Sequence, residues 1–337
     1  MRIAVDAMGG DRQPEAPVQG ALSALARRRD LEVLLVGQES AIRAHLPDRR
    51  PADDRWRIVD APEVIGPGDR PVESFRHKRR SSIAVGLELC RDGAADAFVS
   101  AGNTGALTAG SLLTLGPLAG VARPAMPVVL PTVDGRGFVL LDVGAHMDAG
   151  ARNLFDYAVM GSLYAEQVRG TRRPRVALLN VGTEERKGTA ISREAFAMLQ
   201  ASDLNFVGNI EGRNLFADHA DVVVTDGFVG NVVIKALEGF GHGISQVMGR
   251  ELRHSGFLTL VGAALAARTL RGLRKRMDYA EYGGVPFLGV GGVCVKCHGS
   301  SDVRALCNGV LAAGRIVDAG ILPSIADALT GEATAGV

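Results

Sequence analysis

The chain has 337 residues, of which 47% are hydrophobic, 22% charged and 5% aromatic, and its formal net charge is +1. The balanced charge excludes a general nucleic-acid-binding domain, which is normally strongly basic, and the apolar content excludes low-complexity disorder. A chain of this length buries roughly 75% of its unfolded surface in one large or two ordinary domains.

Short apolar runs alternate with helical patterns along the chain. The runs are residues 3–5, 33–36, 58–60, 97–100, 128–131, 138–142, 176–181, 205–207 and 222–225. Several have no polar alternation, which is typical of strands covered on both faces. Their alternation with helices predicts βαβ units and a largely parallel sheet, whose ligands bind beyond the carboxyl ends of the strands.

We find no long linker, repeat or charge block, and we therefore expect one catalytic unit over residues 1–329 and a frayed tail over residues 330–337. Apolar residues recur every three to four positions from 231 to 252, which predicts an amphipathic helix. The apolar residues 257–267 that follow are too few to span a bilayer, which needs about 20 residues.

These features predict a protruding helical hairpin over about residues 231–278, with a basic segment at 268–276. The hairpin is either buried at a dimer interface or inserted shallowly into a membrane, where its arginines meet anionic lipid. The two interpretations are compatible.

The N-terminus reads as a strand, and we expect no secretory signal. Four cysteines fit a reducing cytoplasm better than a disulfide scaffold. Residues 294–298 have the C-x-x-C-H spacing of haem attachment, with a redox dithiol and simple packing as alternatives. Because haem attachment of this kind requires export, packing is the preferred interpretation, and no second Cys or His pair has zinc-like spacing.

Nucleotide-binding motifs fail in this sequence. In residues 289–294, Cys294 stands where a dinucleotide fingerprint needs its third glycine. In residues 182–189, lysine and glycine occur in the reverse of the P-loop order. Neither motif supports a nucleotide cofactor.

Loops that follow predicted strands are instead suited to a small anion. In the first, Ser100, Gly102, Asn103 and Thr104 lie between a strand and a helix start, where small residues let successive N–H groups converge. The alternative is a purely structural helix cap.

A second loop carries Asp226 and Asn231, with Lys235 one turn into the following helix, and its alternative is a simple capped turn. In a third, Lys187 stands among acidic residues, so it either places a cation in the cleft or is solvated surface charge.

Two further residues occupy the predicted ligand edge of the sheet. Asp6 ends the first strand beside two glycines, and His298 follows an apolar run just before a helix. A lone histidine is usually structural, but this placement favours a functional role as much as a structural one.

Blocks that run in order along the chain together resemble the bacterial phosphate acyltransferase family, the acyl-carrier-protein:phosphate acyltransferases of phospholipid synthesis. The blocks are residues 6–11, 100–106, 141–145, 179–188, 206–212, 224–231 and 298–302. The chain departs from the family pattern at His146, where asparagine is common, at Cys297, where serine is common, and over residues 147–153.

The resemblance implies a three-layer αβα fold similar to isocitrate and isopropylmalate dehydrogenases and to phosphotransacetylase. It also implies a homodimer that reversibly transfers a long-chain fatty acyl group from acyl carrier protein to inorganic phosphate. The acyl phosphate would then feed a membrane glycerol-3-phosphate acyltransferase, and the predicted hairpin adds peripheral membrane contact as an expectation. No redox cofactor is implied, and we expect neither a metal nor a nucleic-acid partner.

We expect phosphate to be held by residues 100–104, Asn231 and Lys187, with Lys235 as a further candidate. His298 is the candidate for proton transfer or oxyanion donation, and either Asp6 or Asp226 would orient it.

An acidic carrier protein would dock on the basic cluster at residues 76–80 or on the one at 268–276, unless these are solvated faces. Rival interpretations are a phosphotransacetylase using short acyl-coenzyme A, a decarboxylating dehydrogenase on the same fold, and a non-catalytic membrane-associated scaffold.

Overall fold

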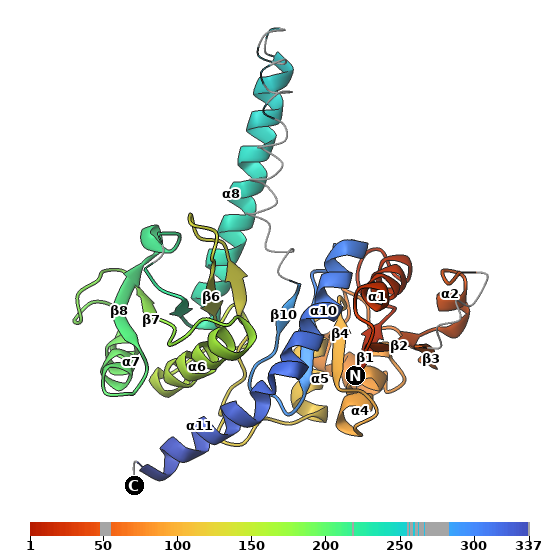
Figure 1. The fold of residues 1–337 in the computed structure, drawn as a ribbon, viewed down its shortest axis with the longest axis horizontal. Coiled ribbons are helices and arrows are strands. Elements are labelled where there is room, and N and C mark those ends of the chain that lie inside the picture. Colours follow the sequence, from red (N-terminus) through yellow and green to blue (C-terminus); the bar gives the residue numbers. More distant parts are fainter. Residues whose placement is uncertain are drawn as a thin grey trace.

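The predicted strands all form, and they are divided between two sheets rather than gathered in one (Figure 1). The computed structural model describes residues 1–47, 55–217, 219–254 and 283–335, together with residues 256, 259, 262 and 266. Its strands are β1 (Arg2–Asp6), β2 (Glu32–Gly37), β3 (Trp56–Asp60), β4 (Ala97–Ser100), β5 (Val128–Leu130), β6 (Phe138–Leu141), β7 (Val176–Asn180), β8 (Phe206–Glu211), β9 (Val222–Val224), β10 (Val285–Pro286) and β11 (Val293–Lys296).

Helices follow most of these strands, as the βαβ pattern predicts. They are α1 (Glu15–Arg27), α2 (Glu39–Arg43), α3 (Pro71–His77), α4 (Ser82–Arg91), α5 (Thr104–Thr114), α6 (Ala151–Leu163), α7 (Ala190–Gln200), α8 (Gly227–His254), α10 (Val303–Ala319) and α11 (Ile321–Ala335). A π-helical turn, η1 (Tyr164–Val168), extends α6, and a 3-10 turn, η2 (Gly212–Asn214), follows β8.

The first sheet has the strand order β10-β11-β4-β1-β2-β3, and all neighbours are parallel except β10 and β11. Helices α1 and α10 pack on one face, and α4 and α5 cover the other. Alternate residues of β1 divide between these faces, since Ile3 and Val5 join one buried cluster and Ala4 joins the other. This half is therefore a three-layer αβα unit.

The second sheet has the order β5-β6-β9-β7-β8, in which only β5 is antiparallel to its neighbour. Helices α6 and α7 pack on one face, and the base of α8 contacts β6. The α/β class and the largely parallel pairing are thus confirmed. Each sheet has one antiparallel strand at an edge, β10 in the first and β5 in the second.

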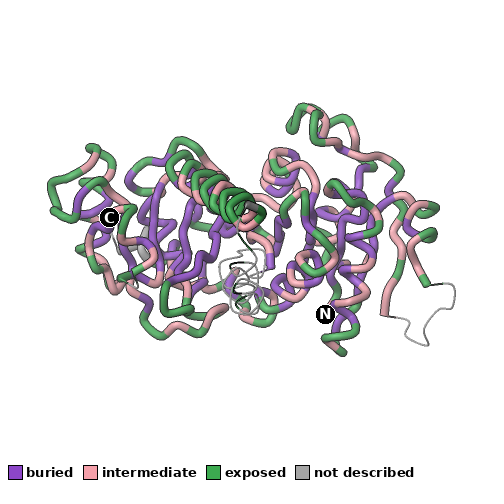
Figure 2. The backbone as a smooth tube through the Cα atoms, turned by 90° about the horizontal axis from the view of Figure 1, so that it is seen from above, coloured by how far each residue is buried: buried purple, intermediate pink, exposed green. Residues whose placement is uncertain are grey.

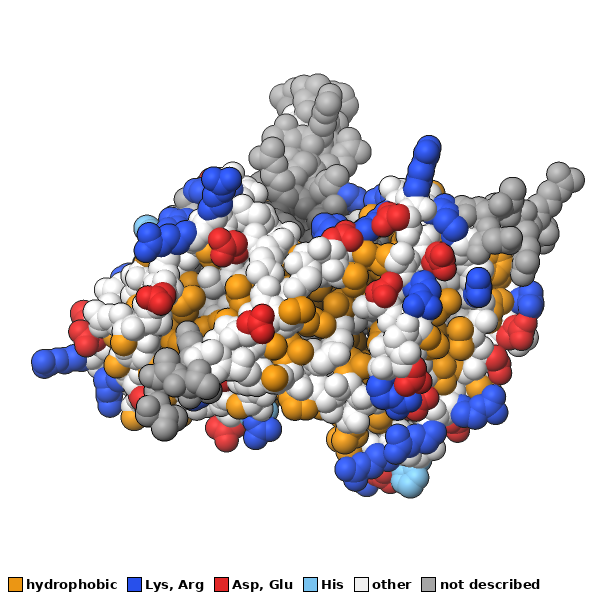
Figure 3. Space-filling model, turned by 60° about the horizontal axis from the view of Figure 1, so that its bottom comes forward, with side chains coloured by type: hydrophobic (Ala, Val, Ile, Leu, Met, Phe, Trp, Pro, Cys, Tyr) orange, Lys and Arg blue, Asp and Glu red, His pale blue; other side chains and the backbone are white. Residues whose placement is uncertain are grey.

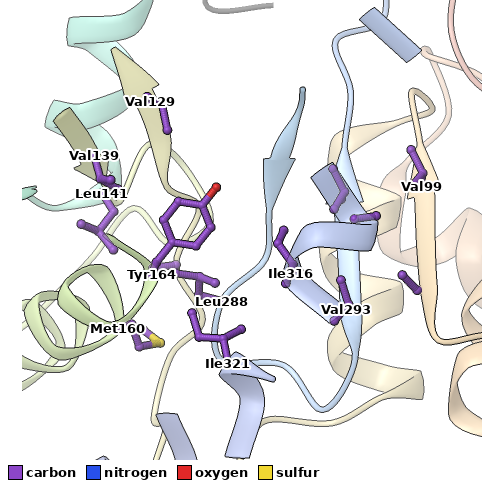
Figure 4. Close-up of a cluster of buried hydrophobic side chains, with 14 of the residues drawn as sticks. Val99, Val129, Val139, Leu141, Met160, Tyr164, Leu288, Val293, Ile316 and Ile321 are labelled. Atoms are coloured by element: carbon purple, nitrogen blue, oxygen red, sulfur yellow. The ribbon is translucent and has the colours of Figure 1, made fainter. Parts of the chain in front are cut away.

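A continuous apolar core joins the two halves. The chain crosses between them through residues 115–126 and 287–291, which pair antiparallel at Pro117 with Val290 and at Ala125 with Leu288. In Figure 4, Leu288 lies between Met160 and Tyr164 of the second half and Ile316 and Val293 of the first. Helix α11 then packs on α6, so the C-terminal helix also ties the halves together.

Helix α8 projects away from both sheets and is largely exposed beyond its base (Figures 1 and 2). It confirms the amphipathic helix predicted from residue 231 to 252. The apolar segment 257–267 and the basic segment 268–276 of the predicted hairpin lie, apart from residues 259, 262 and 266, outside the described residues.

At the other end of the chain, α11 continues to Ala335, so the predicted frayed tail is helical over residues 330–335. Among the described residues, no single helix is long and apolar enough to cross a membrane. Helices α10 and α11, which meet at a bend of 53°, reach that length and apolar composition only when they are taken together. Seen from below, charged side chains gather at the rims and hydrophobic side chains show over the middle (Figure 3).

The close contact of α1 with α10 depends on Gly20. A Cβ atom there would lie 2.7 Å from Leu306 Cβ, so we expect Gly20→Ala to lower the free energy of unfolding by about 1–3 kcal/mol. The matched control is Gly239→Ala in α8, where nothing lies within 4 Å and where alanine should add about 0.5–1 kcal/mol. Urea unfolding measures both, and equal stability of Gly20→Ala and wild type would contradict the contact.

Candidate functional site

Three loops meet at the carboxyl edge of the first sheet, after β1, β4 and β11. The amide of Asp11 donates to the carbonyl of Gly299 at 2.8 Å, and the amide of Cys297 donates to the carbonyl of Ser100 at 2.8 Å. A Cβ atom on Gly9 would lie 2.6 Å from the amide nitrogen of Gly102. The backbones of these loops are therefore in direct contact, and glycine is required where they meet.

Asp6 is the buried centre of this edge, with 2% of its surface exposed. Its carboxylate accepts the Ser100 hydroxyl at 2.6 Å and the Met8 amide at 3.0 Å, and the Ser100 Oγ accepts the Gly102 amide at 3.0 Å. Burial raises the pKa of Asp6, while the hydrogen bond from Ser100 opposes that rise. Asp6, Ser100 and Gly102 thus lie together and fix the shape of the loop.

Lys296, which sequence reasoning did not single out, ends β11 at the same edge. It is 8% exposed, and its Nζ donates to the carbonyl of Cys297. Burial lowers the pKa of Lys296, and the nearby Cys297 and Asp6 act in the opposite direction. The signal available in the sequence was a lysine within an otherwise apolar run, because buried lysines are rare unless paired.

Asn103 caps helix α5, as the structural alternative predicted. Its Oδ1 accepts the Ala106 amide at 3.1 Å, and its Nδ2 donates to the Gly66 carbonyl at 3.1 Å. Thr104 follows in the first turn and is exposed. The side chain of Asn103 therefore holds the start of α5 against the loop around residue 66.

The same loop reaches the basic cluster at residues 76–80. Asp69 accepts the Gly66 amide at 2.9 Å and forms an ion pair with Lys78 at 2.5 Å. Arg80 lies 3.7 Å from Asp60. Part of the positive charge of the cluster is therefore neutralised, while the cluster itself lies one loop away from the start of α5.

His298 is exposed beyond β11. Its Nδ1 accepts the amide of Ser300 at 3.2 Å and lies 2.8 Å from the Ser300 hydroxyl. Because Nδ1 accepts a backbone N–H, a neutral ring carries its proton on Nε2. Among the described residues neither Asp6 nor Asp226 hydrogen-bonds to this histidine, so Ser300 orients the ring.

The two cysteines of the C-x-x-C-H segment are buried and unpaired. Cys294 and Cys297 belong to different buried clusters, so they face opposite sides of the sheet and do not form a dithiol pair. Burial raises the pKa of each thiol to about 12. They are therefore packing residues that stay protonated at neutral pH, and the described residues contain no cluster suited to a metal ion.

At the carboxyl edge of the second sheet, Asp142 organises the loop after β6. Its fully buried carboxylate accepts the amides of Met126, Gly144, Ala145 and His146 at 2.8–3.2 Å. Burial raises the pKa of Asp142, and these four backbone hydrogen bonds oppose the rise. One side chain thus joins the loop to the segment that crosses between the halves.

The start of α8 packs directly on this loop. A Cβ atom on Gly230 would lie 1.9 Å from the carbonyl oxygen of Asp142, and one on Gly227 would lie 2.5 Å from its Oδ2. Asp226 caps α8 by accepting the Val229 amide at 2.8 Å. Asn231 faces the same loop, because its Cβ is 3.7 Å from where a Cβ of Gly144 would lie.

The two candidate lysines of this half are exposed. Lys187 lies in the loop after β7, 3.8 Å from Glu184, and its carbonyl accepts the Asn180 side chain at 3.2 Å. Lys235 lies on α8 and pairs with Glu238 at 2.7 Å. Such exposed pairs contribute little to stability, so both ammonium groups are available to an anionic ligand at low energetic cost.

Sequence comparisons find similar proteins over nearly the whole chain. A family described as fatty acid synthesis protein matches residues 1–323. A phosphate acyltransferase from Brevibacillus brevis is 50% identical over 317 residues, covering 94% of each chain, and one from a Geobacillus species is 45% identical over 329 residues, covering 98% of each.

Solved structures share the fold at low sequence identity. A phosphotransacetylase from Streptococcus pyogenes aligns with a TM-score of 0.61 at 18% identity, covering 94% of each chain. The EutD phosphotransacetylase from Staphylococcus aureus aligns with a TM-score of 0.59 at 16% identity, also covering 94% of each chain.

The four backbone hydrogen bonds that Asp142 accepts should contribute to the stability of the fold. Asn at this position offers only one acceptor oxygen and points an NH2 group at an N–H donor, so we expect Asp142→Asn to lower the free energy of unfolding by about 1–3 kcal/mol. The matched control is Asp226→Asn, because asparagine and aspartate cap helices about equally well. Urea titration of both variants is the measurement, and a larger loss for Asp226→Asn would refute this ranking.

Proposed function

This chain belongs to the phosphate acyltransferase family, and we propose that it reversibly transfers a long-chain fatty acyl group from acyl carrier protein to inorganic phosphate. The observation that carries the proposal is the position of the family's sequence blocks. Those around Asp6, Ser100, Asp142, Asn231 and His298 all fall at carboxyl ends of strands, where α/β proteins bind ligands.

The reaction needs no acylated enzyme intermediate, because phosphate is itself the nucleophile. A phosphate oxygen attacks the thioester carbonyl, an oxyanion forms, and the carbon–sulfur bond then breaks. The proton of hydrogen phosphate ends on the released thiol. The protein must hold the dianion next to the thioester, stabilise the oxyanion and assist the departure of the thiol.

We assign phosphate binding to Lys187, Asn231 and the loop at residues 100–104, with Lys235 as a further cation. The exposed lysines and the amide of Asn231 support this assignment through their charge and their place at the strand ends. In the first loop the backbone and Thr104 carry the proposed contact, because the side chains of Ser100 and Asn103 already hold Asp6 and the α5 cap.

We assign oxyanion donation or proton transfer to His298. Because Nδ1 accepts a hydrogen bond from the Ser300 amide, a neutral ring carries its proton on Nε2, where it can be donated to the substrate. A neutral ring donates a hydrogen bond to the oxyanion, and a protonated ring can give its proton to the thiolate. Asp6 and Asp226 act on the loop conformations through Ser100 and Val229 rather than on the imidazole.

We further propose that the chain docks an acidic carrier protein, forms a homodimer or contacts a membrane, and works in the cytoplasm. The cluster at residues 76–80 supports docking of an acidic carrier, because Asp69 links it to the loop that contacts Asn103. The unpaired cysteines support a reducing cytoplasm. The exposed apolar residues farther along α8, Phe240, Ile244, Val247 and Met248, support a homodimer or peripheral membrane contact.

The decisive test for the donor is a comparison of two substrates. We expect phosphate and palmitoyl-acyl carrier protein to yield free thiol and acyl phosphate, and acetyl-coenzyme A to react far more slowly. Both products are measured, because thiol release alone also reports simple hydrolysis. Preferential use of acetyl-coenzyme A would establish the phosphotransacetylase alternative instead.

The roles assigned to His298 and Lys187 predict different effects on kcat and on the KM for phosphate. His298→Ala should lower kcat by about 10²–10⁴-fold, the contribution typical of general acid–base groups. Lys187→Met should mainly raise the KM for phosphate, and Lys187→Arg should largely restore it because the charge is kept. Steady-state rates over a phosphate series separate these effects, and wild-type rates in folded His298→Ala or Lys187→Met would remove the corresponding assignment.

A further inference from the structure

Large apolar side chains are exposed at the carboxyl edge of the second sheet. Phe228 is 62% exposed, Val232 52%, Met147 52% and Val181 80%. Val229, between the first two, is also exposed. Single exposed apolar residues are ordinary in proteins, but such a group at the mouth of one site is a mark of a binding surface.

The strand register brings the segments that carry these residues to one edge, and the amide of Gly227, next to Phe228, donates to the carbonyl of His146, next to Met147, at 3.2 Å. Leu141 of β6 and Leu178 of β7 flank Val224 of the central strand β9 in one row. Because neighbouring strands lie about 4.8 Å apart, Leu141 and Leu178 are about 10 Å apart, and β7 continues for two residues beyond Leu178, to Asn180. Met147, Phe228 and Val181 follow these three strands within a few residues, and Val232 lies one helical turn after Phe228 on α8.

The edge of the first sheet has a different character. Its segments at residues 7–11, 101–104 and 297–301 consist mainly of glycine and small or polar residues, and none of them contains an exposed large apolar side chain. The two halves of the site therefore differ in polarity. Of the segments compared, those of the second edge carry the exposed large apolar side chains on which a hydrocarbon chain can leave water.

The acyl chain of the donor must leave the reaction centre through one of these edges. It is joined covalently to the carbonyl carbon that phosphate attacks, so it begins within a few bonds of the phosphate site. Asn231, assigned to phosphate, lies between Phe228 and Val232 on α8 and next to the loop of Gly144. An apolar surface is thus continuous with the polar site at the point where the chain starts.

We propose that Phe228, Val232, Met147 and Val181 form the binding surface for the fatty acyl chain. This surface sets the preference for a long chain by removing apolar area of both partners from water. The inference rests on the proposed acyl transfer and adds to it the residues that select the acyl group.

The test compares hexadecanoyl and butanoyl chains carried by the same acyl carrier protein, so that protein docking is equal in both arms. For Phe228→Ser and Val232→Ser, we expect the ratio of kcat/KM for hexadecanoyl over butanoyl donor to fall by about tenfold or more, the range typical of apolar-pocket discrimination. Two variants guard against a folding defect in either one, and circular dichroism checks both.

Val133→Ser is the matched control. Val133 is 91% exposed in the turn before β6, at the opposite end of that strand, and we expect its variant to keep the wild-type ratio. An unchanged ratio in both site variants would overturn the inference. The same holds if Phe228→Ser changes the sedimentation behaviour but not the ratio, because this face would then contact a second copy of the chain.

Failure of the underlying reaction has its own signature. If the wild-type protein makes no acyl phosphate from either donor, the proposed function is wrong and the inference is overturned with it. If the wild-type protein makes acyl phosphate but does not discriminate between the two donors, the function stands and only the acyl surface is refuted.

Discussion

One buried carboxylate, Asp142, holds the second half of the site together. Four backbone amides point at it, and one of them belongs to Met126 in the segment that crosses between the halves. The start of α8 can approach its backbone only because Gly227 and Gly230 lack side chains. The position of Asn231 follows from this contact. A charge buried at a cost in solvation is retained here because the loop, the crossing segment and α8 all depend on it.

The residues of the proposed site are divided between two sheet edges. Asp6, Ser100 and Lys296 form a small, polar and tightly fixed edge on the first sheet, with the His298 ring projecting beyond it. The second edge carries cations and exposed apolar side chains together. The two reactants of the proposed transfer have the same division, because phosphate is charged and the acyl thioester joins a polar carbonyl to an apolar tail. The lysines and the exposed apolar side chains of the second edge thus have the polarity that phosphate and the acyl tail of the proposed reaction require.

The sequence indicated the strands and the carboxyl-edge loops because uninterrupted apolar runs and small-residue turns are local signals. It did not separate the two sheets, since that depends on the pairing of the short strands β5 and β10, which a local pattern cannot show. The caps at Asn103 and Asp226 were foreseen only as alternatives, because capping and ligand-binding loops use the same residue types. A lysine within an apolar run pointed to burial of Lys296, but its place at the same edge as Asp6 follows only from the pairing of β11 with β4 and of β4 with β1.

The antiparallel pairing of the crossing segments and the packing of α11 on α6 give the halves a shared interior, with Leu288 at its centre (Figure 4). Neither half can lose its structure without exposing apolar surface of the other. Unfolding of either half is thus expected to lower the stability of the other, although the chain has two sheets. A substitution that loosens this shared interior is therefore expected to disturb the loops at the carboxyl edges of both sheets, including loops far from the substituted residue.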